Sequence, residues 1–158
     1  NLVLSENDKF DKSITYKGID ISFGLGGIHG AVVNNIVSSD EEYIIKSCDV
    51  KSFYPNLAIR NKWHPEHLPK DIFCNLYEGF YNERISIPKS DPRNYILKII
   101  LNASYGLSND KFSFLRDRKL TLSICINGQL LLTMLFEKIC ETIPDAKLIM
   151  ANTKPLVL

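Results

Sequence analysis

The sequence predicts an α+β domain in which an antiparallel sheet is backed by a long helix and interrupted by a helical hairpin. The first reason is the order of patterns: three segments with strand character come first, then two amphipathic helices, a long apolar helix and a final strand. Strands separated by a helical insert favour α+β over a doubly wound parallel sheet. The second reason is that 158 residues with 45% hydrophobic content can form one compact core.

Four strands are expected, two of them within one segment. Residues 1–17 are polar and mixed, so they are expected to be a frayed lead-in. Residues 18–33 alternate loosely around glycines at 24, 26, 27 and 30, which predicts two strands joined by a bend. No helix follows these glycines as a dinucleotide-binding motif requires, so we interpret them as a turn. Residues 43–50 predict a buried strand that ends in an acid, and residues 146–152 predict another buried strand.

The first helices are predicted over residues 52–60 and 71–86. In the second of these, one side of the helix carries Phe73, Tyr77, Phe80 and Arg84, which are spaced i, i+4, i+7 and i+11. The aromatic side chains are expected to pack, with Arg84 at the end of the stripe. Residues 119–143 are very apolar and predict a long core helix.

The ends of a further helix can be predicted from its sequence. Asp91-Pro92 is typical of an N-cap followed by the first helical residue, because proline lacks only an N–H that has no partner at that position. Gly106 is expected to close the helix, since glycine adopts a left-handed C-terminal turn without a Cβ penalty.

Composition narrows the class of protein. The net charge of +1 excludes strong overall attraction to nucleic acid, but residues 60–119 contain 11 Lys/Arg against 7 Asp/Glu, a local excess of +4. The four cysteines lie far apart in apolar contexts, which predicts buried thiols of a reducing compartment. No signal sequence is recognised, and the apolar stretch 130–136 is too short to cross a bilayer. We therefore expect a cytoplasmic protein without a membrane partner.

A polar line on an otherwise apolar helix is the most informative pattern. Lys98, Asn102 and Tyr105 are spaced i, i+4 and i+7, so they stack along one side of the helix. An ammonium, a carboxamide and a phenol in a line suit a nucleotide, with phosphate at Lys98 and a sugar or base at Tyr105. The alternative is an ordinary amphipathic helix whose polar side chains face water.

A second pattern surrounds the acid at the end of the strand 43–50. Asp49 is followed by a turn and by Ser52-Phe53-Tyr54 at the start of a helix. A carboxylate held by a sheet can bind Mg²⁺, and N–H groups that open a helix can bind phosphate. The alternative is an N-capping region with a packed Tyr-Pro pair.

The two patterns together resemble a known family. Asp49-x-x-Ser52-Phe-Tyr54-Pro55 is similar to motif A of family B DNA polymerases, and Lys98-x-x-x-Asn102-x-x-Tyr105-Gly to their motif B. The short two-helix insert resembles the polymerases of phages and mobile elements, including the protein-primed group. The resemblance implies a palm in residues 1–70 with motif A, fingers in residues 71–106 with motif B, and a second part of the palm in residues 107–158. The palm sheet is expected to carry Asp49 and Asn152 on neighbouring antiparallel strands.

The resemblance also implies roles for individual residues. Asp49 would be the catalytic carboxylate that holds Mg²⁺, with the carbonyl oxygen of Val50 as a further ligand. The nucleotide-binding residues would be those that bind the triphosphate, the sugar and the nascent base pair: Ser52, Phe53, Tyr54, Arg84, Lys98, Asn102 and Tyr105. Tyr54 would exclude a ribose 2′-OH. The implied partners are a DNA primer–template and a dNTP, and a terminal protein as primer stays open.

The third motif of the family is incomplete. Its D-T-D or N-T-D pattern corresponds to Asn152-Thr153-Lys154, so a cation stands where the second metal-binding aspartate is expected. We therefore expect a fragment, truncated or shifted in frame, that does not incorporate nucleotides alone. Two alternatives stay open: a non-catalytic nucleotide- or nucleic-acid-binding module derived from a polymerase palm, and an unrelated α+β interaction domain. The last predicts Asp49 and Asn102 far apart in space.

Overall fold

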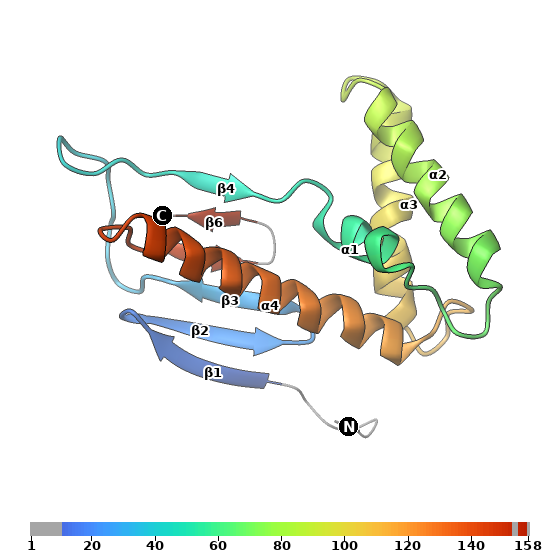
Figure 1. Cartoon of the computed structure of the whole chain (residues 1–158), viewed down its shortest axis with the longest axis horizontal. Coiled ribbons are helices and arrows are strands. Elements are labelled where there is room, and N and C mark those ends of the chain that lie inside the picture. The colour runs from blue at the N-terminus through green and yellow to red at the C-terminus, as the bar shows by residue number, and fades with distance from the viewer. Residues whose placement is uncertain (1–10, 153–154, 158) are drawn as a thin grey trace. The chain divides into compact units, whose positions relative to one another are not determined.

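The computed structural model describes residues 11–152 and 155–157 and confirms the α+β class (Figure 1). The chain packs into two compact units. The sheet unit contains Asn1–Lys51 and Cys125–Leu158, and the helical unit contains Ser52–Ile124. The helical unit therefore includes the whole of the predicted fingers segment, 71–106, together with the helix before it and the first turns of the long helix after it.

All neighbouring strands of the sheet unit are antiparallel. Their order in the sheet is β1-β2-β3-β5-β6-β4, so the two C-terminal strands lie together between β3 and β4. The strands found in the described part of the chain are β1 (Asp11–Tyr16), β2 (Ile19–Gly24), β3 (Gly27–Ala31), β4 (Ser47–Asp49), β5 (Met150–Asn152) and β6 (Pro155–Val157).

Two sequence predictions about strands were wrong. The segment expected as a polar lead-in contains β1, which is joined to β2 by a turn in which Lys17 and Gly18 both have positive φ. This is the backbone that a two-residue hairpin with the right-handed twist of its strands requires. The strand expected over residues 43–50 is reduced to β4, and its three residues are exposed instead of buried. The predicted bend around Gly26 is confirmed, between β2 and β3.

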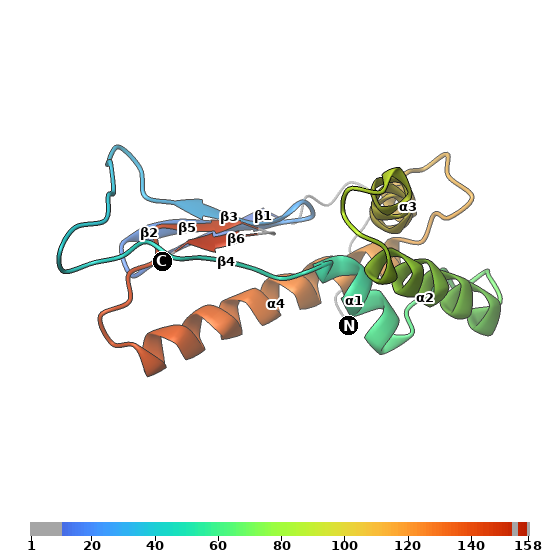
Figure 2. The same ribbon diagram turned by 90° about the horizontal axis from the view of Figure 1, so that it is seen from above.

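Helix α4 (Arg118–Thr142) covers one face of the sheet with the part that belongs to the sheet unit (Figure 2). Leu132 and Phe136 are buried on this side, and the ring of Tyr16 meets Phe136 edge-on at 5.6 Å. The bend after β2 is fastened to the helix, because the Nε2 of Gln129 donates to the carbonyl oxygen of Gly24 at 2.6 Å. The buried amide of Gln129 is thereby satisfied, as burial of a polar group demands.

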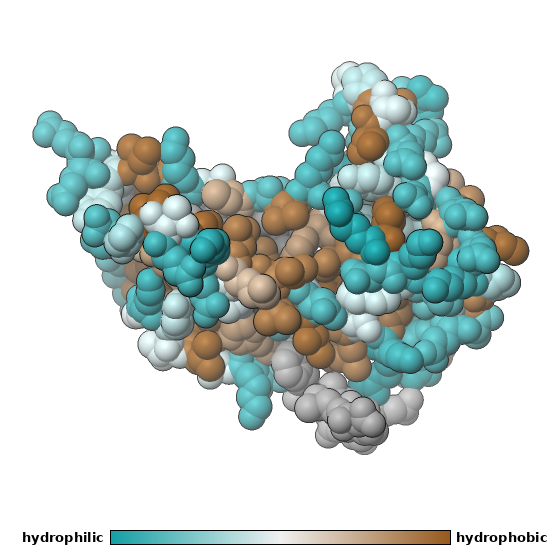
Figure 3. All heavy atoms as spheres, viewed as in Figure 1, coloured by the Kyte–Doolittle hydropathy of each residue, from teal (hydrophilic) through white to brown (hydrophobic). Residues whose placement is uncertain are grey.

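The side of α4 that faces away from the sheet is apolar and exposed. Figure 3 shows hydrophobic side chains gathered along this helix. The large apolar side chains that are more than a third exposed there are Ile126, Leu130, Leu131, Met134 and Leu135. By length and composition alone α4 would also suffice to cross a membrane, but 44% of its most apolar window is buried inside the protein.

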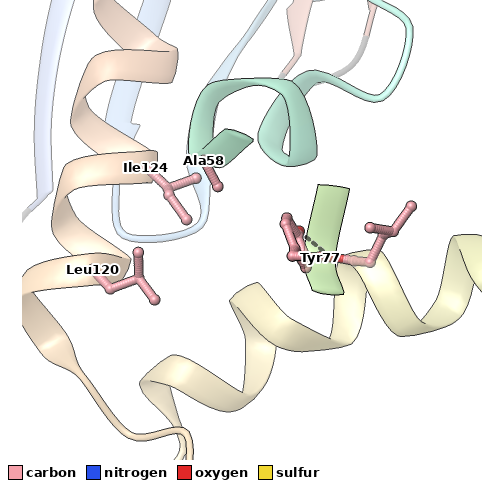
Figure 4. Close-up of a cluster of buried hydrophobic side chains, with 5 residues drawn as sticks. Ala58, Tyr77, Leu120 and Ile124 are labelled. Atoms are coloured by element: carbon pink, nitrogen blue, oxygen red, sulfur yellow. Dashed lines mark hydrogen bonds between the residues drawn. The ribbon is translucent and has the colours of Figure 1, made fainter. Parts of the chain in front are cut away.

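The helical unit is built from α1 (Phe53–Asn61), α2 (Lys70–Ser86), α3 (Pro92–Asn109) and the first turns of α4. Its buried core contains one or two residues from each of these helices: Ala58, Tyr77, Leu101, Leu120 and Ile124 (Figure 4). The predicted packing side of α2 is confirmed, since Phe73 and Phe80 pack against this core beside Tyr77. Arg84, at the end of the same stripe, is partly buried.

The predicted start of α3 is confirmed and its predicted end was wrong. The carboxylate of Asp91 caps the helix by accepting the backbone N–H of Arg93 at 2.9 Å. The helix does not stop at Gly106 but continues to Asn109. The extra turn buries Ser108 completely and lets its hydroxyl hydrogen-bond the hydroxyl of Thr121 at 2.8 Å. This contact outweighs the helix-weakening effect of glycine, about 1 kcal/mol.

Tyr77 lowers the free energy of unfolding of the helical unit at alkaline pH. Its hydroxyl donates to the backbone carbonyl oxygen of Leu101 at 2.7 Å, and burial raises the pKa of Tyr77 well above its ordinary value (Figure 4). Above about pH 10 the unfolded chain loses this proton while the folded chain keeps it, so the free energy of unfolding falls by up to about 1.4 kcal/mol per pH unit. Below pH 10 the full contribution is present. We expect Tyr77→Phe to flatten this part of a stability–pH curve measured by urea unfolding.

Candidate functional site

The carboxylate predicted to bind metal lies at the end of β4. Asp49 is exposed, and its Cα partner across the sheet is Pro155 at the start of β6. The prediction that Asp49 and Asn152 occupy neighbouring strands was wrong, because β6 lies between β4 and β5. Two strand spacings put their backbones about 10 Å apart. Val50, the predicted second ligand, follows β4 and is partly buried.

The register nevertheless brings Asp49 and Asn152 to one edge and one face of the sheet. Ala151 pairs with Leu156 and Leu156 with Cys48, so the next residue of each strand, Asn152, Pro155 and Asp49, forms the following row. Opposed residues of antiparallel strands point to the same side. Ala151 is buried against the α4 side, so the row with Asn152 and Asp49 faces away from α4. Thr153 and Lys154 lie outside the described residues.

Ser52 opens α1 in a backbone conformation that is rare for a residue with a side chain. Its φ of 50° and ψ of 47° are left-handed, and its hydroxyl does not cap the helix. Instead, Nη1 of Arg84 on α2 donates to the Ser52 hydroxyl at 2.6 Å. A left-handed non-glycine residue is unfavourable by about 1–2 kcal/mol and persists only where its surroundings fix it. The contact with Arg84 supplies such a constraint.

Arg84 gives the start of α1 an unusual charge. The N-terminus of a helix carries a partial positive charge and normally attracts acids. Here the first turn of α1 contains no acidic residue, and the nearby cation is a guanidinium. Within the part of the chain that the structure describes, Arg84 has no carboxylate partner, and its buried Nε has no acceptor. Two positive groups without a counter-ion form a site suited to an anion such as phosphate.

Two tyrosines meet beside this positive group. The ring of Tyr54 on α1 lies 4.7 Å from that of Tyr105 on α3, tilted by 57°. Phe53 adds a third ring, 5.9 Å from Tyr54. Both tyrosines also pack against the core of the helical unit, so their positions are fixed. The structure therefore brings together two residues that the sequence assigned to different motifs.

The predicted polar line of α3 is present. Lys98 and Asn102 are exposed and Tyr105 is partly buried, so the line runs along the flank of the buried side of the helix. It spans seven residues, or about 10 Å along the axis. This exposure fits both the nucleotide interpretation and the simpler one of a solvated face.

Asn94 is a residue of this region that sequence reasoning missed. It is buried, and its side-chain amide donates to the carbonyl oxygens of Arg84 and Ile87, both at 3.0 Å. These bonds fasten the start of α3 to the end of α2 and so hold Arg84 in place. The sequence signal that could have identified Asn94 is its position one turn before Lys98, on the same side of the helix.

The groups at the end of β4 that could bind a divalent ion are oxygen ligands. Mg²⁺ prefers a carboxylate or two, substrate phosphates and water, so Asp49 and the carbonyl of Val50 are suitable for one ion. No group of three or more His, Cys, Asp or Glu side chains gathers anywhere in residues 11–152. His67 and Glu66 are engaged elsewhere: the first bonds the carbonyl oxygen of Phe114 and the second pairs with Lys119.

A scan against protein-family models gives no match, and a search of curated proteins finds no related sequence. The two motifs and the geometry described above are therefore the evidence for the function of this chain.

Proposed function

We propose that this chain carries the palm and fingers of a family B, DNA-templated DNA polymerase. The observation that supports the proposal best is the meeting of three distant segments in the helical unit. Ser52 and Tyr54 of motif A contact Arg84 of α2 and Tyr105 of motif B, respectively. A triphosphate-binding group and an aromatic platform for a sugar or base are thereby held side by side.

In the proposed mechanism each of these residues binds or orients the dNTP. The backbone N–H groups of Ser52 and Phe53 and the guanidinium of Arg84 bind phosphate oxygens, and the ammonium of Lys98 neutralises the same triphosphate. Tyr54 packs under the sugar and excludes a 2′-OH. Two further residues of α3 line the nascent base pair: Asn102 and Tyr105.

Mg²⁺ is the proposed cofactor, held by Asp49 and the carbonyl of Val50. An ion held there would supply Lewis-acid stabilisation of the negative charge on the phosphates during transfer of the nucleotide to the primer 3′-OH. The proposed partners are a DNA primer–template and a dNTP.

One feature of the sequence favours a second candidate, a nucleotide- or nucleic-acid-binding module without catalysis. Lys154 replaces the second aspartate of the third motif, and a cation there repels a divalent ion. Such a module would keep the dNTP site of the helical unit and lack metal-dependent nucleotidyl transfer. A primer-extension assay of the Lys154→Asp variant with Mg²⁺ distinguishes the two, because template-directed synthesis by that variant supports the polymerase, whereas dNTP binding without synthesis supports the module.

Replacing Lys98 tests the nucleotide site under either candidate. We expect Lys98→Ala to weaken dNTP binding about 10- to 100-fold, because a charge-assisted contact to phosphate is lost. Isothermal titration with dATP measures the effect. Lys89→Ala removes an equally exposed lysine from the turn before α3 and serves as the matched control. Equal affinities of the two variants would remove Lys98 from the proposed site.

A further inference from the structure

The loop between α3 and α4 holds two phenylalanine rings in solvent. Phe112 is 86% exposed and Phe114 is 77% exposed. The ammonium of Lys111 lies 4.8 Å from the centre of the Phe112 ring, a cation–π contact. Exposed rings of this size lose the stabilisation that burial gives, about 1.5–3 kcal/mol each. Their position in the loop therefore calls for a physical reason.

The exposure is built into an ordered loop. The carboxylate of Asp110 accepts the N–H of Phe112 at 2.9 Å, and the hydroxyl of Ser113 accepts the N–H of Leu115 at 3.0 Å. Leu115 is buried between these turns, and the carbonyl oxygen of Phe114 is bonded by Nε2 of His67 at 2.7 Å. Side-chain bonds of this kind fix turns. The two rings thus point outward from a backbone that is held on both sides.

Basic residues predominate in the segment that holds the two rings. Residues 110–119 contain four basic and two acidic side chains, a local charge of +2. One acid, Asp117, is used inside the loop, where its carboxylate accepts the N–H groups of Glu66 at 2.7 Å and of Leu120 at 3.0 Å. The basic side chains flank the aromatic ones along the chain, with Lys111 before them and Arg116, Arg118 and Lys119 after them, and Lys119 is paired with Glu66.

We propose that residues 110–119 form a stacking platform for single-stranded nucleic acid, with bases on Phe112 and Phe114 and phosphates on the basic side chains. Proteins that bind single strands without sequence preference combine aromatic faces with a basic surface in this way. A protein partner is the less favoured occupant, because interface cores are depleted in lysine. The proposal uses none of the residues of the proposed dNTP site and does not depend on it.

The test compares two labelled 12-mer strands with the same phosphates, oligo(dT) and an abasic strand. We expect the double variant Phe112→Ala/Phe114→Ala to bind oligo(dT) about 10- to 100-fold more weakly in fluorescence anisotropy. Binding of the abasic strand should not change, because it has no bases to stack. Ile72→Ala, which removes a 69% exposed side chain from α2 of the same unit, should leave both affinities unchanged.

Three outcomes would overturn the platform. The first is an unchanged affinity of the double variant for oligo(dT), and the second is an equal loss of its affinity for both strands. The third is equal binding of both strands by the parent chain, and this result would assign the rings to a protein partner. Thermal unfolding of the double variant checks that the fold is retained, as the exposure of both rings leads us to expect. Lys98→Ala, measured in parallel with dATP, reports on the dNTP site alone, so failure of one proposal is distinguishable from failure of the other.

Discussion

A Lys154→Asp variant is expected to bind Mn²⁺ about 10²- to 10³-fold more tightly than the parent chain. Lys154 precedes Pro155 in the sequence, and Pro155 is the Cα partner of Asp49, so the exchange is made one residue before the strand partner of the proposed metal carboxylate. Replacing a cation by an anion about 4 Å from a divalent ion is worth about 4 kcal/mol in water, and salt lowers this value. An EPR titration of free Mn²⁺ measures the affinity. Metal-dependent primer extension should appear only in this variant.

Two controls make this result specific. Adding Asp49→Asn to the Lys154→Asp variant should remove the gain, because it removes the carboxylate that is proposed to hold the ion. Lys17→Asp makes the same change of charge in the turn between β1 and β2 and should give no comparable gain. If the gain survives Asp49→Asn, or if Lys17→Asp reproduces it, then Asp49 is not a ligand.

Leu101→Ala is expected to lower the free energy of unfolding of the helical unit by about 2–5 kcal/mol. The side chain of Leu101 is fully buried at the centre of the core that joins α1, α2, α3 and the start of α4. Removing a large apolar side chain at such a position loses its burial and leaves a cavity. The backbone carbonyl that accepts the Tyr77 hydroxyl is retained, so the effect measures packing alone.

Urea unfolding followed by Trp63 fluorescence measures this loss. The chain has one tryptophan, and it packs against the core in question, so the signal reports on the helical unit. Ile99→Ala on the same helix is the matched control, because Ile99 is 49% exposed and its truncation should change stability by about 0.5 kcal/mol or less. Equal losses at the two positions would contradict the packing described for α3.

Local signals predicted the helices well and the sheet less well. Asp91-Pro92 marked the start of α3, and the spacing of Phe73, Tyr77 and Phe80 marked the packing side of α2. Both depend on neighbours within one or two turns. β1 was missed because its partner is set by the Lys17–Gly18 turn, and β6 because three residues carry no period. The end of α3 was misplaced because a contact with α4, made by Ser108, decides it.

In the candidate site too, features within one helix were predicted and contacts between distant segments were not. Motif spacing predicted the line of Lys98, Asn102 and Tyr105, which a helix produces by itself. The contact of Arg84 with Ser52 joins residues 32 positions apart, and that of Tyr54 with Tyr105 joins residues from different helices. Periodicity within one segment carries no information on such pairs. Only the resemblance to a family connected them beforehand, and the interposition of β6 between β4 and β5 was not anticipated.

The distribution of the thiols provides a natural position for a spectroscopic label. The sequence predicted four buried cysteines, but Cys48 is exposed and Cys74 is partly buried, whereas Cys125 and Cys140 are buried. Burial raises the pKa of Cys74, which lowers its thiolate fraction and its reactivity at neutral pH. A maleimide nitroxide should therefore attach first at Cys48, the residue before Asp49. Paramagnetic broadening of that nitroxide by Mn²⁺ would then report the distance from the label to any ion bound at the end of β4.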